Sequence, residues 1–304
     1  MEDSIRKTKG ISIRTMRQFK FLLQMKVHDI LQIPHSISKT SKVGEIMKKK
    51  VTIIGGAGTI GSILVNGLCD TYEFVILDKN VPPPFSTCRC RTVQVDATNY
   101  QELLERIPKD TDAIINLLTI RSNDDLNDLD QFHKMTNIHF ISSFYILHAA
   151  ITLGIPKVVY ASSNHTTDYY EENGISTLGR KINTNDYPFS KGLYGVLKLA
   201  SENIGHILTR EKDNNLSVIN LRIGSVQKDE YQAVKQNQRL HHTLLSHEDT
   251  VQLFDLALQS TIKYGTYYGV SNNPGKPWET EDSWQDLGFM SKVNSMDVLN
   301  RDTN

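Results

Sequence analysis

The sequence has few cysteines, no long hydrophobic run and no excess of charge of either sign. Three cysteines in 304 residues do not make a disulfide scaffold, so we expect a reducing, cytoplasmic location. No apolar stretch approaches the roughly 20 residues of a membrane-spanning helix. The 34 lysines and arginines balance 34 aspartates and glutamates, whereas dedicated nucleic-acid-binding proteins usually carry a basic surplus. These absences leave an enzyme or a binding domain, folded as one large unit or two modest ones.

Charge is nevertheless distributed unevenly along the chain. Residues 1–46 contain nine lysines and arginines against four acidic residues, so they carry +5, and residues 47–304 carry −5. From Met47 the sequence resembles the start of an α/β protein, because a buried strand is expected four residues later. We expect residues 1–46 to be a basic extension that is either disordered or not part of the native protein. The folded body is then 47–304.

Short apolar segments typical of strands alternate with longer amphipathic segments from residue 51 onward. The expected strands are 51–54, 74–77, 92–95, 113–118, 157–161 and 217–221. The expected helices are 59–68, 101–107, 130–152, 193–209 and 251–259, the last opened by a capping box at Ser246. Several strands are apolar on both faces, which indicates a parallel sheet covered by helices on both sides. We predict an α/β fold with a doubly wound parallel sheet.

A glycine-rich string joins the first expected strand to the first expected helix. Glycine is needed there because the backbone must turn tightly and approach a pyrophosphate, whose charge the helix N-terminus stabilises. The position between a strand and a helix strengthens this interpretation. We therefore predict a Rossmann-like dinucleotide-binding domain. The cofactor contacts expected from the string are Gly55, Gly56, Gly58, Thr59, Ile60 and Gly61.

Three further positions at strand ends suggest how the cofactor lies. Asp78 ends the second strand, 20 residues after Gly58. An acid there can bind the ribose hydroxyls and repel a 2′-phosphate, so the predicted cofactor is NAD and not NADP. Ligands of parallel sheets bind at the carboxyl ends of the strands. We therefore expect Asp96 near the adenine and Leu117 near the nicotinamide ribose.

Two Tyr-x-x-x-Lys strings, 187–191 and 194–198, are candidates for a catalytic pair. Tyrosine and lysine four residues apart share one helix face, and the ammonium would lower the phenol pKa from about 10. The phenol would then act as a general base near neutral pH. The first string contains a proline and is followed by a glycine, which makes it a poor helix. We therefore predict Tyr194 and Lys198 as the pair, with the strand-end Ser163 holding the reacting hydroxyl.

These motifs resemble those of the extended short-chain dehydrogenase/reductase family, which includes the NAD-dependent epimerases and dehydratases. Uronate dehydrogenases are the most similar members, over about residues 50–290. The segments that carry this likeness are Tyr160–Thr166, Gly192–Val196 with Lys198 and Glu202, Leu221–Ser225, and Arg239–Asp249. The resemblance implies oxidation of a small sugar acid, a uronate, at C1 to a lactone, with Tyr194 as general base. It also implies a homo-oligomer.

The resemblance further implies how the sugar is held. Ser163 would bind the reacting hydroxyl, Asn164 and His165 would line the sugar site, and Ser225 would contact further hydroxyls. Arg239 would pair with a substrate carboxylate, which guanidinium geometry suits. This small substrate-binding portion begins near residue 164.

Several alternatives stay open because the segment after the fourth strand, 119–130, departs from the family pattern. The enzyme could be a hexose 6-phosphate dehydrogenase or a sugar epimerase, or the chain could be a dinucleotide sensor without turnover. The short C-terminal sequence favours a free monosaccharide over a nucleotide sugar. Cys88 and Cys90 lack the partners of a zinc site, so we expect no metal. The expected partner is a small sugar, without nucleic acid or membrane.

Overall fold

The computed structural model describes residues 48–81, 90–120 and 125–300. The predicted basic extension, 1–46, lies outside these residues, as does Cys88. Within the described part of the chain, no helix is both long and apolar enough to span a membrane.

One parallel sheet of seven strands organises the described residues. Its strands are β1 (Lys49–Ile54), β2 (Tyr72–Asp78), β3 (Arg91–Gln94), β4 (Ala113–Asn116), β5 (Lys157–Ser163), β8 (Ser217–Ile223) and β9 (Tyr264–Gly269). The order across the sheet is β3-β2-β1-β4-β5-β8-β9, and every neighbouring pair is parallel. The predicted doubly wound fold is therefore confirmed. The seventh strand, β9, was not expected, because two glycines and no aliphatic side chain hide its strand character.

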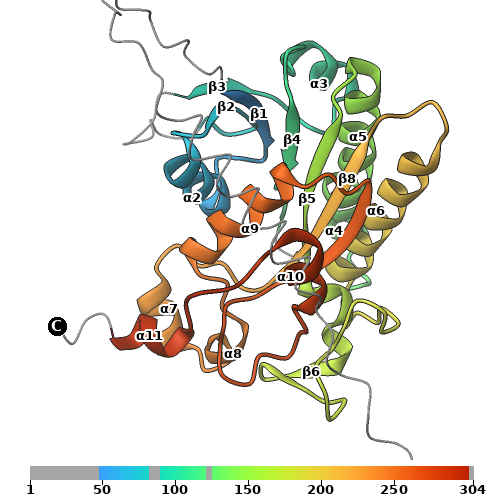
Figure 1. Cartoon of the computed structure of the whole chain (residues 1–304). Coiled ribbons are helices and arrows are strands. Elements are labelled where there is room, and N and C mark those ends of the chain that lie inside the picture. The colour runs from blue at the N-terminus through green and yellow to red at the C-terminus, as the bar shows by residue number, and fades with distance from the viewer. Residues whose placement is uncertain (1–47, 82–89, 121–124, 301–304) are drawn as a thin grey trace, which may run out of the picture. The chain divides into compact units, whose positions relative to one another are not determined.

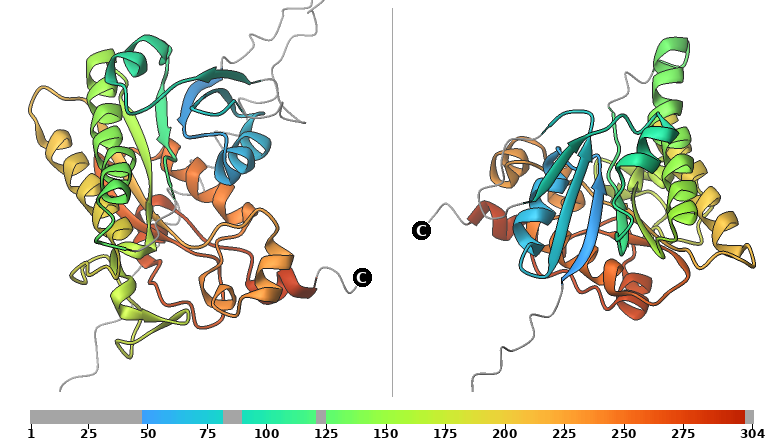
Figure 2. Two further views of the ribbon diagram at one scale, coloured as in Figure 1. Left: turned by 180° about the vertical axis from the view of Figure 1, so that it is seen from behind. Right: turned by 90° about the horizontal axis from the view of Figure 1, so that it is seen from above.

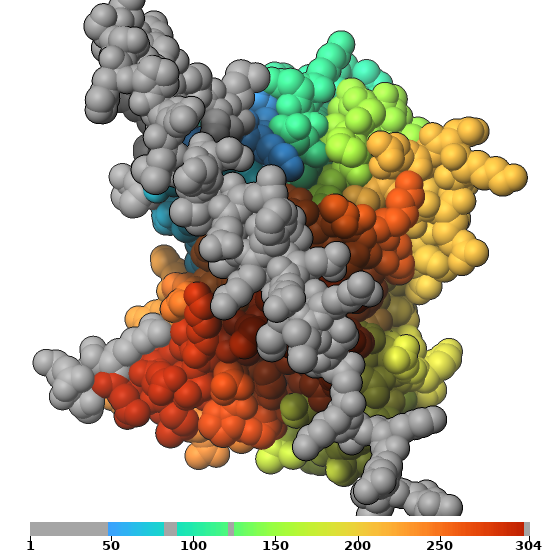
Figure 3. Space-filling view, in the orientation of Figure 1, coloured from blue at the N-terminus to red at the C-terminus, as the bar shows by residue number. Residues whose placement is uncertain are grey.

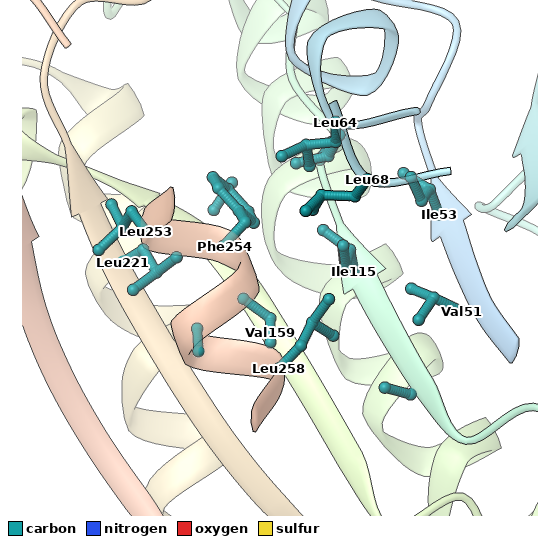
Figure 4. Close-up of a cluster of buried hydrophobic side chains, with 14 of the residues drawn as sticks. Val51, Ile53, Leu64, Leu68, Ile115, Val159, Leu221, Leu253, Phe254 and Leu258 are labelled. Atoms are coloured by element: carbon teal, nitrogen blue, oxygen red, sulfur yellow. The ribbon is translucent and has the colours of Figure 1, made fainter. Parts of the chain in front are cut away.

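Helices cover both faces of this sheet (Figures 1 and 2). On one face α2 (Thr59–Leu68) and α9 (His247–Gln259) pack on the sheet through Leu64, Leu68, Leu253 and Phe254 (Figure 4). On the other face lie α3 (Tyr100–Arg106), α5 (Ser142–Leu153) and α6 (Leu193–Arg210). Strand residues alternate between the two apolar cores, as β1 shows with Ile53 on the first and Ile54 on the second. Both faces are therefore buried, as the apolar strands predicted.

The expected long helix 130–152 is interrupted by a wider turn. It consists of α4 (Leu129–Thr136), a π-helical turn at Asn137–Ile141, and α5. The Ser143 hydroxyl donates a 2.8 Å hydrogen bond to the carbonyl oxygen of His139, inside the π turn. Single π turns of this kind are frequent at functional sites.

The remaining elements gather at the carboxyl edge of the sheet (Figure 1). They are a 3-10 helix (Asn164–Tyr170), the hairpin β6 (Glu171–Glu172) and β7 (Ile175–Ser176), α7 (Glu230–Gln236), α8 (Leu240–Thr243), α10 (Glu281–Leu287) and α11 (Ser295–Asn300). The C-terminal elements, orange and red, lie beside the yellow-green segment that holds β6 (Figure 3). Two small apolar clusters, around Leu244 and Trp278, support most of them, whereas Leu287 of α10 packs into the core on the α2 and α9 side of the sheet. Ser246 caps α9 as predicted, although the helix begins at His247 and not at residue 251.

Candidate active site

The glycine-rich turn between β1 and α2 forms a close bend. Gly55 has a φ of +79°, a left-handed conformation that glycine adopts without steric cost. A Cβ at Gly61 would lie 2.1 Å from the carbonyl oxygen of Gly56, so the first turn of α2 packs directly on the bend. No described atom lies within 4 Å of where a Cβ of Gly58 would be, and this residue precedes a helix N-terminus without a side-chain cap. Open space beside backbone N–H groups suits a pyrophosphate.

A cleft of about 590 Å³ runs from this turn along the ends of β2 and β4. Its lining includes most of the predicted cofactor contacts, namely Gly55, Gly58, Thr59, Ile60, Gly61, Asp78, Asp96 and Leu117. Gly56 is instead buried beneath the bend, against the side chains of Ile53 and Ile76. The cleft lies where the strand order reverses between β1 and β4, which is where doubly wound sheets bind dinucleotides. The residues present therefore fit NAD.

Two carboxylates hold defined positions in this cleft. Asp78 accepts a 2.9 Å hydrogen bond from the backbone N–H of Ala57, so its carboxylate is fixed beside the glycine turn. Asp96 accepts a 2.7 Å hydrogen bond from the Thr98 hydroxyl and lies 3.1 Å from the Nζ of Lys79. These interactions lower the pKa of Asp96, and the Thr98 hydroxyl contributes most. Both acids thus stand at the strand ends where the ribose and adenine were expected.

Tyr194 lies in the first turn of α6 and meets Ser163 at the end of β5. Burial raises the pKa of Tyr194, and the neighbouring hydroxyls of Thr119 and Ser163 only partly offset this rise. The three hydroxyls come from different elements, since Thr119 follows β4. Such a group can hold a substrate hydroxyl and accept its proton.

Lys198 lies one helical turn beyond Tyr194 and is only 2% exposed. Its Nζ donates hydrogen bonds to the carbonyl oxygens of Ala161 (2.7 Å) and Leu118 (3.2 Å), and it is 5.7 Å from the centroid of the Tyr194 ring. Burial lowers the pKa of Lys198 to about 7. The prediction that this lysine lowers the pKa of Tyr194 is therefore wrong for this structure. Burial disfavours the charged form of both groups.

The competing string 187–191 has a different environment. It precedes α6, and Tyr187 is 69% exposed. The Nζ of Lys191 donates a 2.6 Å hydrogen bond to the backbone carbonyl of Glu171. Of the two tyrosines, Tyr194 is the one that packs against His139 and His165 and lies beside the buried Lys198, so the geometry favours Tyr194.

His139 is a site residue that the sequence did not reveal. It lies in the π turn, is 1% exposed, and packs edge-on against the Tyr194 ring with centroids 4.9 Å apart. Burial, together with repulsion from Lys198, lowers the pKa of His139 to about 3. The imidazole is therefore neutral at physiological pH. No local signal marks it, because it lies within an uninterrupted helical pattern of residues.

A buried ion pair supports the end of β5 from behind. Arg222 and Glu202 are 5% and 3% exposed, and their Nη2 and Oε2 atoms are 2.8 Å apart. The Ser162 hydroxyl, next to Ser163, also donates to Glu202. The pair therefore fixes the strand end that presents Ser163, without itself contacting Tyr194 in the interactions described.

Asn164 and His165 follow Ser163 directly. Asn164 is 3% exposed, its Oδ1 accepts a 3.3 Å hydrogen bond from the Ser163 hydroxyl, and its Nδ2 finds no partner among the described residues. A buried donor without a partner suits a ligand hydroxyl. His165 pairs with Asp168 at 2.7 Å and packs edge-on against Tyr194, with centroids 5.6 Å apart. The structure therefore brings both residues to the Tyr194 site.

Ser225 and Arg239 lie together beyond the end of β8. The hydroxyl of Ser225 is 3.4 Å from Nη1 of Arg239 and 3.4 Å from Oγ1 of Thr243. Arg239 also forms an ion pair with Glu171, with 2.6 Å between Nη2 and Oε2 and 3.1 Å between Nε and Oε1. The guanidinium predicted to bind a substrate carboxylate thus already holds a carboxylate of the protein. Across the described residues, no group of three or more His, Cys, Asp or Glu is placed to hold a metal.

Fold and cofactor cleft together define an NAD-dependent oxidoreductase with a Rossmann-like domain. The family model described as "NAD dependent epimerase/dehydratase family" matches residues 51–242, which is more than half of the chain. The chain belongs to this family.

Relatives within the family range from close to distant. The uncharacterized protein YtbQ of Bacillus subtilis is 50% identical over 256 residues, covering 84% of this chain and 99% of YtbQ. The NAD-dependent glucose-6-phosphate dehydrogenase of Haloferax volcanii is 24% identical over 260 residues, covering 82% and 95%. Among solved structures, glucuronic acid dehydrogenase from Chromohalobacter salexigens is similar with a TM-score of 0.68 at 25% identity, covering 84% and 88%. Glucuronic acid is a uronate, so the resemblance to uronate dehydrogenases is confirmed at low identity.

Proposed function

We propose that this protein is an NAD-dependent dehydrogenase that oxidises the ring C1 hydroxyl of a small sugar to a lactone. The observation that carries the proposal is the cluster of the Tyr194, Ser163 and Thr119 hydroxyls beside the buried Lys198. It stands at the carboxyl edge of the sheet, and Thr119 also lines the cofactor cleft. Two relatives of named activity, the glucose-6-phosphate dehydrogenase and the glucuronic acid dehydrogenase, act on a sugar phosphate and a sugar acid, which supports a sugar substrate.

The protein's own residues would perform the proton transfer. Ser163 would orient the C1 hydroxyl. Tyr194, once its own phenol proton has passed to solvent, would accept the proton of the C1 hydroxyl on its oxygen while the C1–H bond breaks. NAD held in the cleft would supply the hydride acceptor, so that the C1–OH group would become the lactone carbonyl. Lys198, buried between Tyr194 and the cleft residue Leu118, would hold the nicotinamide ribose.

The sugar would lie between the ends of β5 and β8. The unpartnered Nδ2 of Asn164, the His165 ring and the Ser225 hydroxyl offer polar contacts for ring hydroxyls. Beyond β8, the described residues add α9, β9 and several short helices without a separate larger lobe, which favours a free sugar over a nucleotide sugar. An epimerase would return the cofactor unchanged, whereas the proposed reaction accumulates NADH.

A turnover assay tests the proposal. The purified protein is mixed with NAD and a panel of aldoses, uronates and hexose 6-phosphates, and NADH absorbance is followed. We expect NADH to form with at least one sugar. Tyr194→Phe should lower kcat by about 100-fold or more and leave NADH binding intact, whereas the exposed control Tyr187→Phe should retain activity. NADH binding without turnover on any sugar would refute the proposal and favour a sensor.

A further inference from the structure

The Glu171–Arg239 ion pair differs from an exposed surface ion pair, because Glu171 is buried and is held by further contacts. Glu171 is 4% exposed, and its carboxylate also accepts a hydrogen bond from the backbone N–H of Gly174 in the β6–β7 turn. The backbone carbonyl oxygen of Glu171 accepts a hydrogen bond from the Nζ of Lys191. The carboxylate therefore cannot leave Arg239 without losing several contacts and exposing a buried charge.

The pair occupies one of the two edges through which a guanidinium binds carboxylates. Nε and Nη2 of Arg239 both point to Glu171, and Nη1 reaches the hydroxyl of Ser225 at 3.4 Å. Of the five N–H donors of an arginine, one on Nη1 and one on Nη2 remain. Those donors suit a hydroxyl oxygen. The pair would not attract a substrate carboxylate or phosphate, because the charges of Arg239 and Glu171 cancel. At short range, the negative carboxylate of Glu171 would oppose such an anion.

The pair also stands where a sugar would extend from the catalytic group. Ser163 is in register with Ile223 across β5 and β8, and Ser225 follows Ile223 by two residues, about 7 Å farther along the chain. A ligand whose reacting hydroxyl lies on Ser163 therefore reaches Ser225, and with it Arg239, at the end remote from the reacting carbon.

We propose that Glu171 sets the substrate class. By neutralising Arg239 at the remote end of the sugar site, it selects an uncharged aldose over the corresponding uronate or sugar phosphate. This inference rests on the proposed C1 dehydrogenase activity and narrows its substrate. It also explains why Arg239, which was expected to recognise a carboxylate, presents no net positive charge to the substrate.

Paired sugars that differ only at C6 test the proposal on the wild-type protein. Glucose is compared with glucuronate and glucose 6-phosphate, and galactose with galacturonate, by kcat/KM for NADH formation. We expect the neutral sugar of each set to be preferred by about tenfold or more, because a like charge beside Glu171 opposes the anion.

Variants assign the preference to Glu171. Glu171→Gln removes the charge and keeps an oxygen for Arg239, so the uronate-to-aldose ratio of kcat/KM should rise about tenfold or more. Adding Arg239→Gln should abolish that gain. Glu172→Gln, the same change at the exposed neighbour in the hairpin, should leave the ratio unchanged. Thermal unfolding and NADH binding show that each variant is folded.

Three outcomes would overturn the inference, and they differ in what they say of the function. A wild-type preference for uronates or hexose 6-phosphates refutes the role of Glu171 but keeps the dehydrogenase. An unchanged ratio in a folded Glu171→Gln variant does the same. Absence of turnover with every sugar, while NADH still binds, refutes the proposed function and the inference with it.

Discussion

The buried imidazole of His139 makes the stability of this protein depend on pH in a way that can be calculated. Its pKa is about 3 in the folded chain, against 6.5 for an exposed histidine. As pH falls below 6.5, the unfolded chain takes up a proton that the folded chain excludes, so stability decreases until pH reaches about 3. Between pH 8 and pH 5 the loss amounts to 1.5 pH units, or about 2 kcal/mol at 1.36 kcal/mol per unit.

A substitution isolates this contribution from the other titrating groups. His139→Gln keeps a polar side chain in the π turn but cannot take up a proton. We would measure the free energy of unfolding in urea for both proteins at pH 8 and at pH 5. The wild type should lose about 2 kcal/mol more than the variant over this interval. Comparing the two differences cancels any constant cost of the substitution itself.

Equal losses in the two proteins would refute the reasoning, because His139 would then take up a proton in the folded state. A second variant, His139→Phe, guards against an artefact of the glutamine. It should reproduce the reduced pH dependence of His139→Gln. If it instead behaves like the wild type, the dependence does not come from the imidazole.

Three further predictions concern the cofactor cleft and its support. Gly61→Ala places a Cβ 2.1 Å from the Gly56 carbonyl oxygen and should abolish NADH binding, measured by fluorescence titration. A folded variant that still binds NADH would contradict the tight packing. Asp78→Asn should weaken NAD binding and reduce the preference for NAD over NADP, measured as the ratio of their Kd values, and an unchanged ratio would exclude this role. Glu202→Gln leaves the buried Arg222 charge without its partner and should lower the free energy of unfolding by about 3–5 kcal/mol, whereas a loss below 1 kcal/mol would show that the site readily admits water.

The cofactor half of the site could be predicted because its signals are local. Seven consecutive residues, 55–61, encode a bend, an opening and a helix start. Asp78 ends the very next strand. Each feature depends on backbone geometry within one strand–turn–helix unit, which the amino-acid types specify directly.

The substrate half depends on distant pairs that the sequence pattern does not show. Glu171 and Arg239 are 68 residues apart, and neither stands in a periodic segment whose face could be assigned. The π turn at 137–141 is equally hidden, because it changes the hydrogen-bond register and leaves the residue pattern helical. The strand β9 contains tyrosines and glycines, and only its pairing with β8 makes it a strand. In each case tertiary contacts outweigh local preference.

The π turn has a consequence for how this protein can vary. Such a turn holds one residue more than a regular helical turn between its flanks. Deleting one residue from Asn137–Ile141 would allow α4 and α5 to join as an ordinary helix, with both flanking segments still packed. The edge-on packing of His139 against the Tyr194 ring would then be lost, while the rest of the fold would change very little. A one-residue gap at this point in related chains would therefore mark proteins that keep the architecture but have lost or rebuilt the surroundings of Tyr194.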